Sequence, residues 1–201
     1  RELFSAHPPA LAAVSLDGPR ELHDRFRGRD GSFDAALAAV GILKATGCGE
    51  VVLGTTVTRL NADRLAEMFP AVLASGADSW GLHLFAPEGR GAEHRELFPT
   101  PDQLRRAAAF ARRKRALFRV ELDNEWGSAG ADDVFYRDQP FLCGAGRISC
   151  VVGAGGEVMP CTTTDPAESE GNVRTRPLRE IWAQGFGRFR AGGFAVVLPE
   201  T

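Results

Sequence analysis

A regular alternation of strand-like and helix-like segments over residues 11–122 is the feature that most constrains the fold. Between short apolar runs lie segments whose apolar residues recur at helical spacing, after Ser32, after Asn61 and from Pro101 onward. The apolar or β-branched runs predicted as strands are Leu11–Leu16, Val51–Val57, Trp80–Phe85 and Phe118–Leu122. A strand, helix, strand order of this kind predicts a parallel α/β sheet.

The predicted helices have recognisable ends and faces. Ser32 is expected to N-cap the first helix, because a Ser side chain can accept a hydrogen bond from the first turn. Thr100 and Gln103 match the capping box, with Pro101 at the first helical position. The second helix is expected to bury Leu65, Met68, Phe69, Val72 and Leu73.

Polar residues follow the predicted strands, at the sheet edge where α/β folds bind ligands. Asp17 and Asn61 lie there, and Asp17 is equally well explained as a turn residue before Gly18. Asp123 and Glu125 follow the last strand and are weak candidates for proton transfer, with a solvated charge cluster as the alternative. His83 lies within a predicted strand, where a buried histidine with satisfied hydrogen bonds is expected.

Three of the four cysteines lie in one predicted β-hairpin, in which short apolar strands flank the glycine-rich stretch 153–156. A hairpin can bring Cys143, Cys150 and Cys161 towards one point, as metal binding requires. Cys48 is expected at the opposite rim of the sheet and is excluded from this group.

Clustered cysteines without a secretory signal favour a metal or an iron–sulfur cluster over disulfides. A structural zinc site usually uses paired C-x2-C knuckles, whereas the spacing here is C-x6-C-x10-C. Iron–sulfur binding is therefore preferred, with a zinc-stabilised α/β domain as the alternative. A fourth ligand is left open between Asp165, a substrate atom, water and another segment.

The bulk properties exclude several classes of protein. The 201 residues are 44% hydrophobic, so the chain can bury a core, and its net charge of −2 argues against a general nucleic-acid binder. No apolar run is long enough to span a membrane, and no signal peptide is visible. A cytoplasmic location without nucleic-acid or membrane partners is expected.

Several motifs, in this order, resemble the second half of a radical S-adenosylmethionine (SAM) barrel. They are VSLDGP, HDRFRG, GSF and TTVTRLN. The pattern Cys143-x12-Gly156-x4-Cys161, followed by GNV and PLREIW, resembles a SPASM or twitch domain of the same superfamily.

The resemblance implies an α/β fold with the later strands of a partial (β/α)6 TIM-like barrel, followed by a small hairpin domain. Residues 1–122 would form the barrel part and residues 123–201 the SPASM or twitch domain. An auxiliary 4Fe-4S cluster would be held by the three hairpin cysteines. The residues implied on the SAM side are Ser15, Asp17, Asn61, Leu84 and Pro87.

The activity implied is modification of a peptide or protein by 5′-deoxyadenosyl-radical hydrogen abstraction, as in peptide maturases. The chain would be the C-terminal part of such an enzyme, and an electron donor such as flavodoxin or ferredoxin is implied as a partner. The CxxxCxxC loop that holds the SAM-cleaving cluster is absent from these residues, so this chain is not expected to cleave SAM alone. The alternative is a non-catalytic module that binds a peptide or partner.

Overall fold

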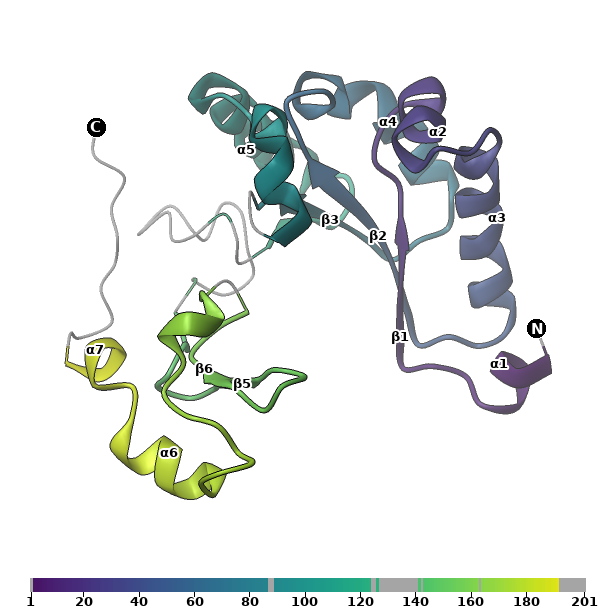
Figure 1. Cartoon of the computed structure of the whole chain (residues 1–201). Coiled ribbons are helices and arrows are strands. Elements are labelled where there is room, and N and C mark those ends of the chain that lie inside the picture. Colours follow the sequence, from purple (N-terminus) through teal and green to yellow (C-terminus); the bar gives the residue numbers. More distant parts are fainter. Residues whose placement is uncertain are drawn as a thin grey trace. The chain divides into compact units, whose positions relative to one another are not determined.

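The computed structural model describes residues 2–86, 89–123, 126, 141, 143–162 and 164–191. These residues form two compact units, the first over 2–126 and the second from 141 onward (Figure 1). The indole of Trp126 donates to the Leu82 carbonyl at 2.7 Å, so this residue packs on the first unit. The boundary at residue 122 stays a prediction, because residues 124, 125 and 127–140 lie outside the described part of the chain.

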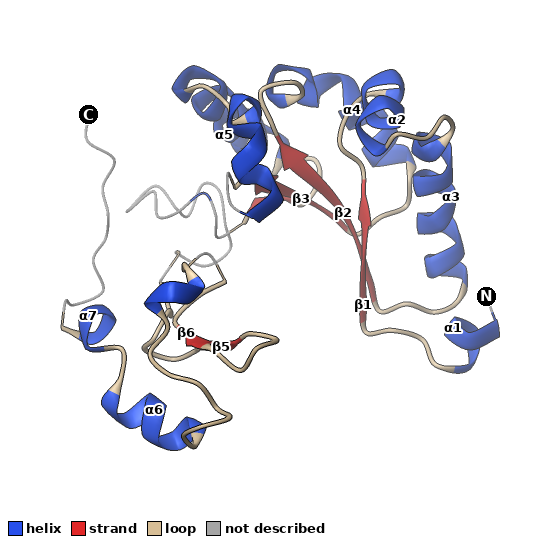
Figure 2. Cartoon of the chain, viewed as in Figure 1, coloured by secondary structure: helices blue, strands red, loops and turns tan. Residues whose placement is uncertain are grey.

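The first unit is built on a four-stranded parallel sheet with the order β1-β2-β3-β4. Figure 2 labels β1, β2 and β3 of this sheet. The strands are β1 (Leu11–Ser15), β2 (Glu50–Val57), β3 (Ser79–Leu84) and β4 (Val120–Leu122). They agree with the four predicted strands to within two residues. The expected parallel α/β sheet is therefore confirmed.

Helices and short 3₁₀ segments connect the strands. The α-helices are α1 (Glu2–Ala6), α2 (Arg20–Arg27), α3 (Ser32–Ala45), α4 (Leu65–Ala74) and α5 (Pro101–Lys114). The 3₁₀ segments are η1 (Ala62–Arg64) and η2 (Gly89–Leu97). The three predicted helices correspond to α3, α4 and α5, and α2 is a full eight-residue helix that ends at Gly28, whose φ is 65°.

The two faces of the sheet differ in character. One face buries Val51, Leu53, Trp80 and Leu82 completely, in a core that also takes in residues of α3, α4 and α5. The alternate residues define what we call the open face, represented by Ser15, Gly54, Gly81 and His83, and register places the first three of these in one row. Ser15 and His83 on this face are exposed. The open face therefore offers small and polar groups to a ligand.

The start of α3 corrects one prediction. Gly31, with φ 76°, occupies the N-cap position, and Ser32 is the first helical residue. The Asp24 carboxylate accepts the N–H groups of Gly31 at 2.9 Å and Phe33 at 2.8 Å, and also the Ser32 hydroxyl at 2.8 Å. These bonds, led by that from Phe33, lower the pKa of Asp24. A carboxylate eight residues upstream thus supplies the cap that Ser32 was expected to give.

The other helix predictions are mostly confirmed. Thr100 and Gln103 form the capping box. The Gln103 N–H donates to the Thr100 hydroxyl at 3.3 Å, and the Thr100 N–H donates to Gln103 Oε1 at 3.0 Å. In α4 the expected apolar residues are buried except Leu73, which is 46% exposed. Leu73 lies about 100° around the helix from the buried Val72, which turns its side chain away from the core.

The second unit contains the predicted hairpin, with β5 (Val151–Val152) antiparallel to β6 (Val158–Met159). Its turn closes with the Gly156 N–H donating to the Gly153 carbonyl at 2.9 Å, and Gly156 has φ 93°. Three helical segments follow, at η5 (Pro166–Glu168), α6 (Leu178–Gln184) and α7 (Gly187–Arg190). Pro177 is the N-cap of α6, and Leu178, the first helical residue, is 41% exposed.

The core of the second unit is small. Val158, Ile181 and Phe186 are fully buried, and Cys150, Trp182 and Phe189 pack around them. Phe186 has φ 64°, a left-handed conformation that non-glycine residues seldom adopt. Across the described ranges of both units, no helix is long and apolar enough to cross a membrane.

Candidate functional site

The carboxyl ends of β1 and β2 are joined by a buried polar network around Asp17 and Asn61. The Asn61 amide donates to the carbonyls of Asp17 and Thr56, each at 2.8 Å, and its oxygen accepts the Thr58 N–H at 2.7 Å. The Asp17 carboxylate accepts the Thr56 N–H at 2.9 Å and forms an ion pair with Arg27. Sequence reasoning placed Asp17 and Asn61 at one rim, and the structure brings them into contact.

The same network restricts what Asp17 can do chemically. Its side chain is only 1% exposed, whereas the Arg27 side chain is 40% exposed. Each carboxylate oxygen already accepts from a protein donor. In the described structure, Asp17 therefore holds the strand ends and α2 together and is not presented to a ligand. Its catalytic role stays a prediction.

His23 is part of this buried rim. Its Nδ1 accepts the Asp17 N–H at 2.9 Å, so the neutral ring carries its proton on Nε2. Burial lowers the pKa of His23, against the opposing effect of nearby Asp17. Protonation of Nδ1 would also remove the acceptor of this hydrogen bond. His23 is therefore a buried, neutral, structural histidine.

This burial predicts a loss of stability in mildly acidic solution. The pKa of His23 is lower in the folded than in the unfolded state, so the unfolded chain takes up the proton first as pH falls below about 6.5. We expect the free energy of unfolding to fall between pH 7 and pH 5.5, by at most about 1 kcal/mol, the limit that the unfolded histidine sets over this range. Asp24, with its lowered pKa, contributes only at more acidic pH.

Urea titrations at the two pH values measure this effect. The control is His23→Asn, whose amide oxygen can accept the same N–H but does not titrate in this range. A His23→Asn variant with an undiminished pH dependence would refute the assignment.

A second pair of titratable side chains lies on the open face. His83 Nδ1 is 2.7 Å from Asp123 Oδ2, and the side chains are 49% and 15% exposed. The expectation that His83 is a core histidine is wrong, because residue 83 follows Leu82 on a strand and so points to the opposite face. Asp123, a predicted candidate for proton transfer, is thus brought into contact with a histidine that sequence reasoning assigned elsewhere.

Two of the remaining residues predicted on the SAM side lie at the same edge of the sheet. Ser15 ends β1 and is exposed, and Leu84 ends β3 and is half-buried. Pro87 and Glu125 lie outside the described residues. The rim partners Arg27 and Thr56 were missed, because nothing in their local sequence indicates that they contact Asp17.

The three predicted cysteine ligands lie in the second unit and are not in disulfides, with Cys143 exposed and Cys150 and Cys161 half-buried. Cys150 directly precedes β5, and Cys161 lies two residues after the end of β6. Within the described ranges, no three His, Cys, Asp or Glu side chains form a group that could hold a metal ion. The three thiols are therefore of a type that binds iron, but the described structure does not bring them close enough together to share one metal ion.

Two other residues considered above as ligands, Cys48 and Asp165, make hydrogen bonds to the nearby backbone. Cys48 is buried in the core of the first unit, and its thiol donates to the Glu50 carbonyl at 3.2 Å. Asp165, one possible fourth ligand, accepts the Ala167 N–H at 2.9 Å at the start of η5.

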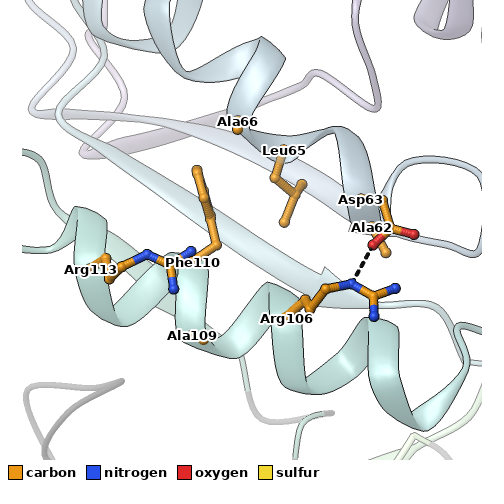
Figure 3. Close-up of a pocket in the computed structure, with 8 residues that line it drawn as sticks. All are labelled: Ala62, Asp63, Leu65, Ala66, Arg106, Ala109, Phe110 and Arg113. Carbon is orange, nitrogen blue, oxygen red and sulfur yellow. Dashed lines mark hydrogen bonds and ion pairs between the residues drawn. The ribbon is translucent and has the colours of Figure 1, made fainter.

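A pocket of about 210 Å³ lies between the η1–α4 segment and α5 (Figure 3). Asp63 and Arg106 form an ion pair across it at 2.7 Å. The lining residues are Ala62, Asp63, Leu65, Ala66, Arg106, Ala109, Phe110 and Arg113. None of the predicted site residues is among them, so this pocket is separate from the rim and from the cysteines.

Comparison with known proteins gives a family match for the second unit. Residues 143–197 match the SPASM family, described as an iron-sulfur cluster-binding domain. This range contains all three hairpin cysteines.

Curated relatives cover most of this chain but only part of their own lengths. The AdoMet-dependent heme synthase of Nitratidesulfovibrio vulgaris is 29% identical over 197 residues, which are 89% of this chain and 53% of the relative. The mycofactocin maturase MftC of Mycolicibacterium smegmatis is 32% identical over 165 residues, or 74% of this chain and 38% of the relative. The chain thus spans about half or less of the length of these relatives.

Solved structures confirm the fold. Streptococcus suis SuiB bound to S-adenosylmethionine matches 90% of this chain with a TM-score of 0.65 and 14% identity, covering 44% of SuiB. The anSMEcpe structure with bound AdoMet and a peptide matches 90% of the chain at a TM-score of 0.62 and 17% identity, covering 52% of anSMEcpe. The expected partial barrel followed by a hairpin domain agrees with these matches.

Proposed function

Because this chain is a SPASM-domain relative of the radical SAM enzymes, we propose that it forms the C-terminal part of an enzyme that modifies a peptide or protein. Hydrogen abstraction by a 5′-deoxyadenosyl radical would start the reaction. The observation that carries the proposal is the SPASM match over the cysteine hairpin, which follows a parallel sheet that itself resembles SAM-binding enzymes. A peptide substrate is supported by the relatives named maturase and by SuiB bound to its precursor peptide SuiA.

A second candidate function comes from the same set of relatives. The AdoMet-dependent heme synthases match 89% of this chain, against 74% for the mycofactocin maturases. Heme synthesis is therefore the alternative to peptide modification. The two candidates share the cofactors and differ in the substrate.

We propose that Cys143, Cys150 and Cys161 ligate an auxiliary 4Fe-4S cluster in the SPASM domain. Thiolates are the usual ligands of such clusters, and the three cysteines are not in disulfides and belong to one unit. Because they do not form a three-donor group in the described structure, this assignment requires them to move together when iron binds. When bound, the cluster would supply electron transfer or a substrate-binding position.

The open face and rim are the proposed SAM side of the first unit. Ser15 is exposed on the open face, whereas Leu84 is half-buried at the rim and lies on the same side of β3 as the buried Leu82. Pro87 is the third residue proposed on this side. Asp17 and Asn61 would not contact SAM directly. They would position its site by fixing the ends of β1 and β2 through their hydrogen bonds. The reaction needs one electron, for which we propose a flavodoxin or ferredoxin partner. Free thiols and iron chemistry suit a reducing compartment, so we propose the cytoplasm.

The cluster assignment predicts the result of removing its thiols. After anaerobic reconstitution with iron and sulfide, the wild-type chain should bind iron and show broad visible absorbance. The double variant Cys143→Ala/Cys161→Ala should lose most of both, because two of the proposed ligands are gone. The matched control is Cys48→Ala, which removes a buried thiol of the other unit and should retain the absorbance.

Elemental analysis and the control decide the outcome. Zinc in place of iron in the protein as isolated would support the zinc-stabilised domain. A wild type that takes up no iron, or a Cys48→Ala variant that loses it equally, would contradict the ligand assignment.

A separate assay distinguishes the substrates. In the full-length gene product, 5′-deoxyadenosine formation that rises on addition of a precursor peptide supports peptide modification, whereas a response only to a heme precursor supports the alternative. No 5′-deoxyadenosine with either substrate would favour the non-catalytic binding module.

A further inference from the structure

A closed loop of the second unit, residues 144–149, joins the first two hairpin cysteines, and we call it the ligand loop. Cys143 directly precedes the ligand loop and Cys150 directly follows it. The Ser149 N–H donates to the Gly144 carbonyl at 3.2 Å, so the two ends of the loop lie side by side. The backbone alone therefore brings these two cysteines towards each other.

The side chain of Arg190, in α7, holds the ligand loop at its middle. Its Nε donates to the Gly146 carbonyl at 2.8 Å, although the two residues are 44 positions apart in the chain. The guanidinium carbon lies 4.7 Å from the centroid of the Trp182 ring and 5.4 Å from that of Phe186. Two aromatic faces favour one position of the planar guanidinium. A residue near the end of the described chain thus fixes the loop between two proposed ligands.

The ring of Phe186 packs against the same glycine of the loop. A Cβ atom added at Gly146 would lie only 2.9 Å from Phe186 Cδ1 and 3.0 Å from Phe186 Cβ. Both residues have φ 64°, which glycine adopts readily but phenylalanine adopts only at a cost. Such strain persists where the surrounding structure maintains it, and it is concentrated at functional sites. Here the strained residue turns the chain from α6 into α7 and so sets Arg190 against the loop.

We propose that Phe186 and Arg190 are positioning residues of the cluster site, which hold Cys143 and Cys150 as a prepared pair of ligands before iron binds. This inference rests on the proposed function, in which these thiols ligate an auxiliary cluster. Only Cys161, which follows the hairpin, then has to approach the pair. Changes to residues that orient metal ligands without binding the metal typically lower its affinity about 10–100-fold.

The prepared pair is tested first without iron. Phenylarsine oxide forms a stable adduct only where two thiols reach the same arsenic atom, and its oxygen then leaves as water. In the Cys48→Ala/Cys161→Ala parent, only Cys143 and Cys150 remain, and one arsenical should bind per chain. Adding Arg190→Ala should weaken this binding about tenfold, because the loop loses its hold. An unchanged affinity in that variant, or no adduct with the parent, would overturn the proposal.

Matched variants in the same parent separate this contact from a general effect of changing α7. Arg188→Ala removes a neighbouring arginine whose side chain is 80% exposed, and it should leave the affinity unchanged. Gly146→Ala should weaken binding, because its Cβ would meet Phe186. Gly187→Ala should not, because a Cβ there would meet nothing within 4 Å. Equal losses in Arg188→Ala and Arg190→Ala would overturn the proposal.

Hydrogen exchange separates positioning from loss of the fold. The Val158 N–H donates to the Gly171 carbonyl at 2.8 Å, and its protection reports that the hairpin is intact. This protection should be retained in Arg190→Ala and in Gly146→Ala while arsenical binding falls. Loss of protection together with binding in both variants would show a merely structural role and overturn the proposal.

Iron uptake connects this result to the proposed function. After anaerobic reconstitution of the chain with all four cysteines, Arg190→Ala should retain less iron and visible absorbance than the wild type, whereas Arg188→Ala should match it. Equal iron in Arg190→Ala and the wild type would overturn the positioning role. If the parent binds the arsenical but the wild type takes up no iron, the cluster assignment fails instead, and the pairing of Cys143 with Cys150 stands separately.

Discussion

Replacement of Trp80 by alanine should lower the free energy of unfolding of the first unit by about 3–5 kcal/mol, as for other large-to-small core changes. Trp80 is fully buried in the central strand β3. Its ring stacks on Phe69 with centroids 6.3 Å apart and meets Phe110 edge-to-face at 5.8 Å. A domain is typically stable by only about 5–15 kcal/mol, so this single change removes a large part of the margin.

The indole nitrogen of Trp80 also contributes to the stability of the first unit, through a hydrogen bond. It donates to the Thr55 hydroxyl at 2.8 Å, and that hydroxyl donates to the Leu16 carbonyl, so one chain of hydrogen bonds links β3, β2 and the residue that follows β1. Trp80→Phe keeps most of the apolar contact and breaks only this link, so we expect a smaller loss of about 1–2 kcal/mol.

Guanidinium titration followed by far-UV circular dichroism measures both variants. Trp182→Ala serves as the control, because Trp182 packs in the core of the second unit and should leave the unfolding of the first unchanged. A Trp80→Ala variant that loses less than about 1 kcal/mol would show that the core does not depend on this ring as described.

Asp17→Ala should destabilise the first unit by about 2–3 kcal/mol, because hydrogen bonds to a charged group are removed from a buried position. The variant leaves the Thr56 N–H without its carboxylate and Arg27 without its ion-pair partner. Arg27 is partly exposed and can be solvated by water, which limits the cost.

Asp17→Asn separates the two contacts. Its amide oxygen can still accept the Thr56 N–H, so we expect a loss of about 1 kcal/mol from the Arg27 pair. In a double-mutant cycle, Arg27→Ala should lower the free energy of unfolding much less in the Asp17→Asn background than in the wild type. Additive losses in that cycle would contradict the ion pair. An enzyme that remains stable with Asp17→Asn but loses turnover would instead support the catalytic role predicted from sequence.

The strand and helix pattern of the first unit was predictable because local signals agreed with the tertiary structure. Val51–Val57 is rich in β-branched residues, and Thr100 with Gln103 is a complete capping motif within four residues. The α3 cap was not predictable in this way, since Asp24 lies outside the helix and reaches it only through the fold of α2.

The site was predictable in part. The rule that ligands bind at the carboxyl ends of parallel strands found Asp17, Asn61 and Asp123, whose neighbours are now known. The pairing of His83 with Asp123 was missed, because contact between adjacent parallel strands depends on register over 40 residues of sequence. The glycine within each of β2 and β3 was the available signal, since it indicated that a group lies close to those strands.

The three fully buried side chains at the centre of the second unit have a consequence for how the protein matures. So few apolar contacts leave little reserve against the entropy of ordering the chain, and Phe186 adds a strained backbone conformation. Cys150 packs directly against this core. A metal bound by Cys150 would therefore add its binding free energy to the stability of the unit. Before it binds such a metal, this unit should therefore open more readily than the first unit and be cut faster by proteases.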